Sequence, residues 1–196
     1  MAYRLSGGAD PADVVAVLSL AAAAEPRCGA TRVIAVDGPS GSGKTSLAAA
    51  VAARLDAAVV HMDDLYPGWD GLTAGVDAVT EQILEPLARG ERAAYRRWDW
   101  HRDGWGETVP IPATGLLVLE GCGASVLPAG AYAAVRVWVD APTAVRRERG
   151  IARDGDAYAP HWERWRGQEI AMFAADGTRD RADLIVDTTP PDTAPM

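Results

Sequence analysis

The chain has 196 residues, of which 48% are hydrophobic and 23% charged, and its formal net charge at pH 7 is −8. This balance is typical of a globular protein with one full hydrophobic core, and the acidic excess argues against a protein that coats nucleic acid. Two cysteines, Cys28 and Cys122, are too few for a disulfide framework and do not stand at a metal-binding spacing, so we expect a reducing, cytoplasmic setting.

The chain is expected to begin with a helix. Asp10 stands at a suitable N-cap position, and Pro11 follows it in the first turn. The apolar run at residues 14–24 is preceded by Asp10 and Asp13 rather than by a positive cluster, so we do not expect a signal peptide. No apolar run in the sequence is long enough to span a membrane.

Residues 38–45 read Gly-Pro-Ser-Gly-Ser-Gly-Lys-Thr, which is the G-x-x-x-x-G-K-T pattern of a phosphate-binding P-loop. A short apolar run with β-branched residues precedes it at 31–37, and strong helix formers follow it at 46–55. Strand, glycine loop and helix is the arrangement that this motif requires. The alternative is a glycine- and serine-rich turn with an incidental lysine, which the flanking segments disfavour.

This loop predicts a nucleotide site with magnesium. The glycines let the backbone turn tightly, so that its N–H groups and the positive end of the following helix surround the phosphates. Lys44 is expected to reach the β- and γ-phosphates, and the hydroxyl of Thr45 is expected to bind Mg²⁺. The candidate ATP-binding residues are Gly38, Ser40, Gly41, Ser42, Gly43, Lys44, Thr45 and Ser46.

Strand and helix candidates alternate along the rest of the chain. Further strands are expected at 57–62, 116–120, 134–140 and 182–187, and helices at 76–89, 142–149 and 157–175. This alternation predicts an α/β fold, a P-loop NTPase with three α/β/α layers and a five-stranded, mostly parallel sheet. We expect one domain over 1–187 with a lid at about 146–160, and a flexible tail at 188–196.

Acidic residues follow two of the expected strands. Asp63 and Asp64 come after the strand at 57–62, and Glu120 ends the strand at 116–120. A carboxylate that faces the phosphates can deprotonate an attacking hydroxyl or hold magnesium through water. The alternatives are a solvated acidic turn for the pair and a solvated strand end for Glu120. The neighbouring P-loop favours the functional interpretation.

An arginine cluster follows the strand at 134–140. Guanidinium groups can stabilise the charge that spreads over a transferring phosphoryl group, and Gly150 and Gly155 can let the segment move as a lid. The alternative is an exposed basic helix face that makes weak surface ion pairs. The cluster consists of Arg146, Arg147, Arg149 and Arg153.

Aromatic residues gather near Trp98, Trp100 and His101. Such rings can stack on a base or a sugar, and they are also ordinary core and rim residues, so both interpretations stay open. His101 has no cysteine or histidine at ligand spacing, which argues against a metal site there. His61 and His161 are expected to be structural or exposed.

Together these segments resemble the uridine kinase family of P-loop kinases over residues 33–187. Besides the P-loop and the arginine-rich lid, Met-Asp-Asp-Leu-Tyr at 62–66 is similar to the family's D-x-F-Y, and Leu-Glu-Gly at 119–121 to its strand-end E-G. Trp-Asp-Trp at 98–100 looks like a variant of the family's Y-D-F. The chain looks closest to the compact uridine-kinase-like ATP-binding proteins of high-GC bacteria.

The resemblance implies that the γ-phosphoryl group of ATP is transferred to a hydroxyl of a small molecule, with a nucleoside such as uridine or cytidine as the first candidate. By this likeness Asp63 is the base toward the acceptor hydroxyl and Tyr66 lines the acceptor pocket. Asp99 holds sugar hydroxyls, and Trp98 and His101 are candidate contacts beside it.

The same likeness implies a magnesium site and a closing lid. Thr45, Asp63 and Glu120 surround Mg²⁺, partly through water. Arg149 or Arg153 closes over the transferring group, where a lid also excludes water that competes as acceptor.

Three departures leave the acceptor open. Leu65 replaces the aromatic residue of D-x-F-Y, and Trp98 and Trp100 replace Tyr and Phe. The family's base-reading histidine lies a few residues beyond Y-D-F and precedes Ser-Arg, whereas His101 directly follows Trp100 and precedes Arg102. The alternatives are a kinase for another metabolite or an antibiotic, and a non-metabolic ATP-binding switch. We expect no nucleic-acid or membrane partner; the oligomeric state is open, a homodimer being one option.

Overall fold

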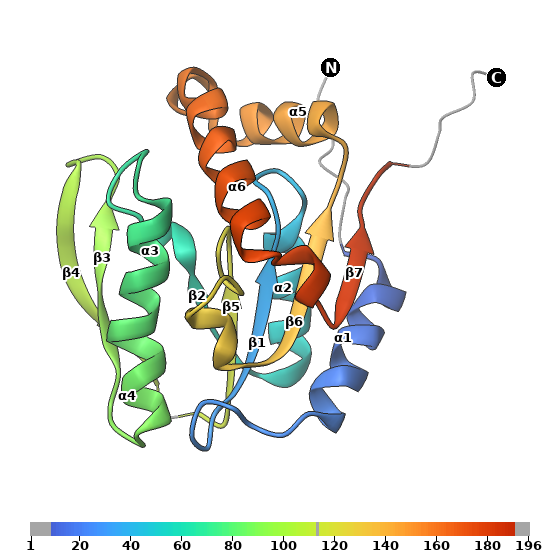
Figure 1. The fold of residues 1–196 in the computed structure, drawn as a ribbon, viewed down its shortest axis with the longest axis vertical. Coiled ribbons are helices and arrows are strands. Elements are labelled where there is room, and N and C mark those ends of the chain that lie inside the picture. The colour runs from blue at the N-terminus through green and yellow to red at the C-terminus, as the bar shows by residue number, and fades with distance from the viewer. Residues whose placement is uncertain (1–8, 113, 191–196) are drawn as a thin grey trace.

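The structure, a computed structural model, describes residues 9–112 and 114–190. Its centre is a five-stranded sheet in the order β2-β5-β1-β6-β7, and all neighbouring strands are parallel (Figure 1). The carboxyl ends of the strands therefore lie at one edge of the sheet, where α/β proteins bind their ligands. The strands are β1 (Arg32–Asp37), β2 (Ala58–His61), β5 (Leu116–Glu120), β6 (Ala133–Asp140) and β7 (Leu184–Asp187).

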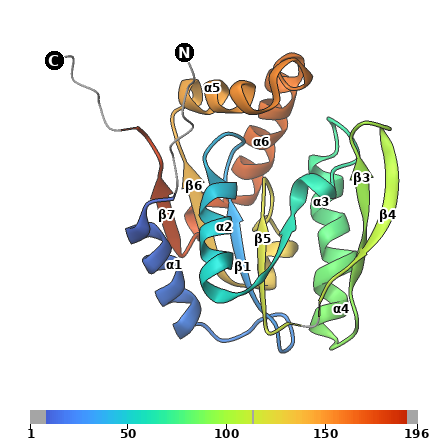
Figure 2. The ribbon, with the colours of Figure 1, turned by 180° about the vertical axis from the view of Figure 1, so that it is seen from behind.

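Helices cover both faces of this sheet (Figures 1 and 2). One face carries α1 (Pro11–Ala23) and α2 (Lys44–Leu55), which stand in front of the sheet in Figure 2. The other carries α3 (Leu72–Val79), α4 (Glu85–Ala88) and α6 (Trp162–Asp176), and α5 (Thr143–Asp154) lies across the carboxyl ends of the strands. This three-layer arrangement confirms the predicted fold class.

Strand β1 shows why both faces are covered. Its successive side chains point to opposite faces, as in any strand. Val33 and Ala35 pack in the core cluster under α3 and α6, whereas Ile34 and Val36 pack in the cluster under α1 and α2. An almost continuous apolar run is therefore the expected sequence of a central parallel strand.

Three helices differ from their predicted bounds. The helix expected at 142–149 is α5, which continues to Asp154. The helix expected at 76–89 begins at Leu72 and continues through a π-helical turn, Thr80–Leu84, into α4. The helix expected at 157–175 begins at Trp162, because two 3-10 turns, Gly155–Ala157 and Ala159–His161, come first.

A feature that the sequence did not predict is an antiparallel hairpin of β3 (Ala94–Asp99) and β4 (Gly104–Pro110), which stands beside α3 in Figure 1. It forms a separate two-stranded sheet. Within 9–112 and 114–190, no helix combines the length and hydropathy that a membrane span requires.

Candidate functional site

The P-loop connects β1 to α2 at the carboxyl edge of the sheet, as predicted. Gly38, Gly41 and Gly43 have positive φ angles of 135°, 77° and 100°. A Cβ atom on Gly38 would lie 2.1 Å from the carbonyl oxygen of Val139, and one on Gly41 would lie 2.2 Å from that of Arg146. Only glycine fits at these two positions, because the loop packs directly against the backbones of β6 and α5.

The start of α2 fits the phosphate chain of a nucleotide. The N-cap residue Gly43 offers no side-chain acceptor, so the first N–H groups of the helix are left without a side-chain partner. Such N–H groups and the positive end of the helix dipole attract anions. Within the described part of the chain, the buried Oγ of Ser42 also lacks a hydrogen-bond partner.

Lys44 is buried beside this loop. Its Nζ donates a hydrogen bond of 2.9 Å to the carbonyl oxygen of Pro39 and lies 3.6 Å from the Sγ of Cys122. Burial lowers the pKa of Lys44, but the electrostatic influence of Cys122, Glu169 and Glu120 outweighs it and leaves the pKa above its ordinary value. The site therefore holds a permanent cation, as phosphate binding requires.

Thr45 and Glu120 lie together on the other side of the loop. The Oγ1 of Thr45 is 3.3 Å from the Oε2 of Glu120, a residue that is 4% exposed. Hydroxyl and carboxylate oxygens are the ligand types that Mg²⁺ prefers, with water and phosphate completing the shell. A group of three or more His, Cys, Asp or Glu side chains able to hold a metal does not occur in the described residues.

His61, expected from the sequence to be structural or exposed, belongs to this group. Its Nδ1 lies 2.5 Å from the Oε1 of Glu120. This hydrogen bond raises the pKa of His61 above 6.5, against the opposite effect of burial. The protonated ring therefore stabilises the folded state. The stabilisation is complete below about pH 6.5, the pKa of His61 in the unfolded chain, and it is lost as the pH rises through the higher pKa of the folded state.

This pair gives a testable pH dependence. Because His61 is half-buried, we expect its contribution to the free energy of unfolding to be below about 1 kcal/mol. Thermal melts of the wild-type protein and of His61→Asn, without magnesium, at about pH 6 and about pH 8.5 measure it. The melting temperature of the wild-type protein should exceed that of the variant more at the lower pH, and an equal difference at both would contradict the assignment.

Asp63 lies in the 3-10 turn Met62–Asp64 that follows β2. Its side chain is exposed, yet burial by the surrounding protein is the largest cause that raises the pKa of its carboxyl group, and Glu120 raises it further. Arg153 and Lys44 act in the opposite direction. The carboxylate therefore lies within electrostatic reach of the P-loop lysine, Glu120 and Arg153.

The neighbouring carboxylate, Asp64, is turned toward the hairpin. It accepts hydrogen bonds from the hydroxyl of Tyr95 at 2.9 Å and from the Nε of Arg97 at 3.1 Å. The indole nitrogen of Trp100 donates to the backbone oxygen of Asp63 at 2.9 Å. The hairpin thus holds the turn that presents Asp63, and the two adjacent acids have different surroundings.

Tyr66, a candidate for the acceptor pocket, is 1% exposed. Its hydroxyl donates to the backbone oxygen of Cys122 at 2.7 Å, and its ring packs edge-on against Trp165. Its contacts support the backbone that follows Glu120.

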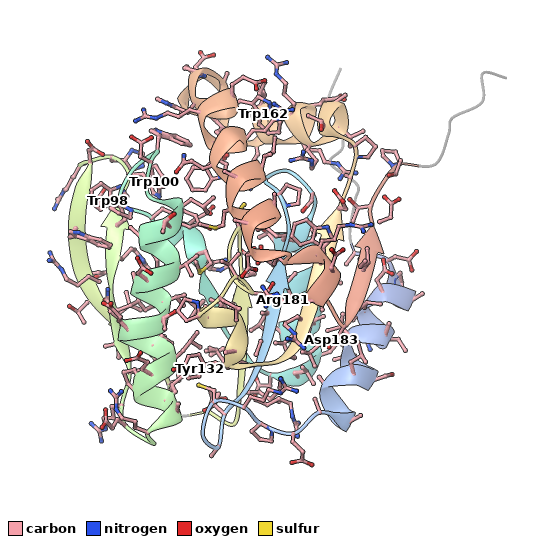
Figure 3. The ribbon with its side chains drawn as sticks, viewed as in Figure 1. Trp98, Trp100, Tyr132, Trp162, Arg181 and Asp183 are labelled. Atoms are coloured by element: carbon pink, nitrogen blue, oxygen red, sulfur yellow. The ribbon has the colours of Figure 1, made fainter. Side chains whose placement is uncertain are left out.

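The other candidate acceptor contacts lie on the hairpin. The Oδ1 of Asp99 accepts hydrogen bonds from the backbone N–H groups of His101 and Arg102, so this carboxylate caps the hairpin turn. Trp98 packs edge-on against Trp105. Trp98 and Trp100 lie on the hairpin side of the molecule, apart from Trp162 at the start of α6 (Figure 3).

An aromatic cluster that the sequence reasoning missed centres on Trp69. Its ring stacks on His161 at 4.4 Å and on Tyr158 at 5.6 Å, and it is tilted against Trp100 at 4.8 Å between ring centres. These contacts join the loop after β2, the hairpin and the segment between α5 and α6.

The two candidate lid arginines have different partners. Arg153 is bonded to its neighbour Asp154 and acts electrostatically on Asp63. Arg149 donates to the hydroxyl and carbonyl oxygens of Thr188. Thr188, which the sequence placed in the flexible tail, also donates to the carbonyl oxygen of Ser42 at 2.6 Å, while residues 191–196 of that tail lie outside the described residues.

Asp37 is a buried acid that the sequence analysis did not identify. Its carboxylate accepts hydrogen bonds from the N–H groups of Gly38, Gly123 and Ser125 at 2.7 to 2.8 Å, and from the Ser125 hydroxyl at 2.9 Å. Burial raises its pKa, and these hydrogen bonds partly offset the effect. Asp37 thereby ties the P-loop to the segment after β5. The sequence did offer a signal for this role: Asp37 ends an apolar strand and directly precedes the first P-loop glycine.

Known proteins support this architecture. A model of the cytidylate kinase family matches residues 34–100. A structure described as a possible uridine kinase from Bacillus stearothermophilus is 21% identical, with a TM-score of 0.63 over 90% of this chain and 98% of that one. A candidate fructose transport system kinase from Silicibacter sp. TM1040 is 23% identical, with a TM-score of 0.62 over 92% and 98%.

No curated protein sequence matches the chain significantly. The structural similarity spans almost the whole of both chains, and the matched family segment contains the P-loop and the turn that carries Asp63. The chain has the fold of a uridine-kinase-like P-loop kinase.

Proposed function

We propose that this protein is an ATP-dependent kinase that transfers a phosphoryl group to a hydroxyl of a small molecule. The observation that carries the proposal is the turn after β2, which places the Asp63 carboxylate within electrostatic reach of Lys44. A kinase needs a base beside the phosphates, because the attacking hydroxyl must lose its proton. A nucleotide-dependent switch has no such requirement.

In this proposal each residue has a separate role. Lys44 and the N–H groups of the P-loop bind the phosphates of ATP. Thr45 and Glu120 hold Mg²⁺, with water between the metal and Glu120. The metal, when bound, neutralises charge on the phosphates.

Two other residues take the proton of the acceptor and stabilise the charge of the transferring phosphoryl group. Asp63 aligns the acceptor hydroxyl and takes its proton. Arg153 stabilises the charge of the transferring group, since it is the lid arginine that acts on Asp63. The aromatic cluster around Trp69 shields this region from water, which would otherwise compete as acceptor.

For the acceptor we propose a nucleoside, with uridine and cytidine first. The sequence motifs at 62–66 and 119–121 and the similarity to a candidate uridine kinase support this choice. A sugar is the second candidate, because a similar structure bears the name of a fructose transport system kinase. Trp100, whose ring is partly exposed, offers a surface on which either acceptor can stack.

An acceptor screen tests the proposal. Wild-type protein is incubated with ATP and Mg²⁺ and with each of a set of nucleosides, sugars and other hydroxylated metabolites, and ADP formation is followed. At least one acceptor should raise ADP formation well above the rate without acceptor, with a phosphorylated product seen by mass spectrometry. Slow hydrolysis that no acceptor stimulates would contradict the kinase assignment and favour a switch.

A further inference from the structure

Ser40 of the P-loop is held at three of its atoms by the segment that follows β6. Its N–H donates to the Oε1 of Glu169 at 2.7 Å, and its carbonyl oxygen accepts from Arg146 at 3.2 Å. Its hydroxyl accepts from the hydroxyl of Tyr158 at 2.7 Å. The three partners come from α6, from α5 and from the segment between them. All three therefore bind the same residue of the P-loop.

Glu169 is the unusual member of this group. It is 2% exposed, and the Sγ of Cys122 also donates to its Oε1 at 3.1 Å. Its Oε2 lies 3.7 Å from a guanidinium nitrogen of Arg146. The carboxylate is therefore well satisfied in this structure, although it belongs to no pattern that the P-loop motif requires.

The negative charge of Glu169 lies beside the P-loop, where the negatively charged phosphates of a nucleotide would bind. The N–H groups of a P-loop serve to bind phosphate oxygens, and one of them here binds a carboxylate. Glu169 also acts electrostatically on Lys44, the second partner of the phosphates. Two anions that need the same donors compete, and their repulsion inside a protein is weakly screened.

There is room for the carboxylate to leave the loop. A cavity of about 390 Å³ borders Glu169 on the side of β6. Arg146 lines the same cavity, so Glu169 can keep this cationic neighbour after it releases Ser40. The charged residues of the cavity wall besides Glu169 are Arg146 and Arg179, which are cationic, and Asp140 and Asp180, which are anionic.

We infer that Glu169 competes with the nucleotide phosphates for the Ser40 N–H and for Lys44, and that it thereby limits the affinity of the protein for ATP. The inference rests on the proposed function only in requiring that the P-loop bind a nucleotide. Glu169 is in this sense a positioning residue: it holds the loop in the free protein and must yield when the phosphates arrive.

The variant Glu169→Gln tests the inference, because it keeps an acceptor oxygen for Ser40 and removes the charge. Isothermal titration calorimetry with MgATP and MgADP should show a Kd for ATP about tenfold lower than in the wild-type protein, and a smaller change for ADP. The matched control is Glu163→Gln, which removes the same charge from an exposed position of the same helix. Its nucleotide affinities should equal those of the wild-type protein.

If Glu169 only supported the structure of the loop, Glu169→Gln should bind ATP more weakly, since a loosened loop binds phosphate less well. Unchanged or weaker ATP binding in a folded Glu169→Gln variant therefore overturns the inference, and so does equal tightening in Glu163→Gln. If Glu169→Gln does not fold, Glu169→Met removes the charge at similar volume and should bind ATP more tightly in the same way. Failure of the wild-type protein to bind either nucleotide would instead refute the proposed function.

Discussion

Replacement of Asp63 by Asn is expected to lower kcat by about 10²–10⁴-fold with any acceptor that the wild-type protein phosphorylates. The amide has the same shape as the carboxylate but cannot take the proton of the attacking hydroxyl. ATP binding should persist, because Lys44 and the start of α2 do not depend on the Asp63 side chain for their hydrogen bonds. Steady-state kinetics give kcat, and calorimetry with MgATP gives the Kd.

The adjacent residue provides the matched control. Asp64→Asn changes the same functional group one position away, where the carboxylate bonds to Tyr95 and Arg97 of the hairpin. We expect this variant to lose some thermal stability and to keep most of its turnover. A full rate in Asp63→Asn, or an equal loss in both variants, would show that the base had been assigned to the wrong group.

The nucleotide half of the site could be predicted because its signals are local. The P-loop motif, the apolar strand before it and the helix formers after it are contiguous, and each element depends mainly on its own residues. The strand at 116–120 was predicted to the residue for the same reason, since a buried parallel strand is an unbroken apolar run.

The residues that hold the loop could not be predicted in this way. Ser40 and Glu169 are 129 positions apart, and Asp37 and Ser125 are 88 apart. In sequence Glu169 is one charged residue within a helix of mixed composition, and periodicity alone does not separate a buried acid from an exposed one. Only the fold shows that α6 brings this carboxylate to the P-loop.

The hairpin was missed because its strands are mostly half exposed. Alternation of apolar and polar residues signals a strand only when one face is buried, and in β4 every residue is exposed or intermediate. The Asp-Gly pair at 103–104 stands at the end of a four-residue turn rather than at the centre of a two-residue one, and Asp103 has the positive φ, at 50°. This omission matters for function, because the hairpin decides which of two adjacent acids, Asp63 or Asp64, is free for chemistry.

The contacts at the P-loop suggest how binding and closure can be linked. Ser40 is held by three residues of α5, α6 and the segment between them. Thr188 bonds to Ser42, and the indole of Trp100 bonds to the backbone of Asp63. A phosphate chain that rearranges the loop must therefore alter contacts to α5, α6 and the segment after β7. Among these contacts, removing the buried Lys44 cation of the P-loop should have the widest effect.

Replacement of Lys44 by Met is expected to lower kcat/KM by about 10²–10³-fold and to weaken ATP binding as well, whatever the acceptor. Met keeps most of the apolar stem and removes the charge that faces the phosphates. It also removes a buried cation that offsets the charges of Glu169 and Glu120, so a lower melting temperature should accompany the loss. This pattern differs from that of Asp63→Asn, in which ATP binding persists.

The composition of the chain allows a direct check of this residue. Lys44 is the only lysine among the 196 residues, so an amine-reactive acyl phosphate of ATP can modify no other lysine side chain. We expect one adduct on the wild-type protein by intact mass, located at residue 44 by peptide mapping and suppressed by excess MgATP. Lys44→Met should remain unlabelled there. Labelling of Lys44 that ATP does not suppress would contradict a nucleotide at this loop, because a bound phosphate chain must cover the amine that holds it.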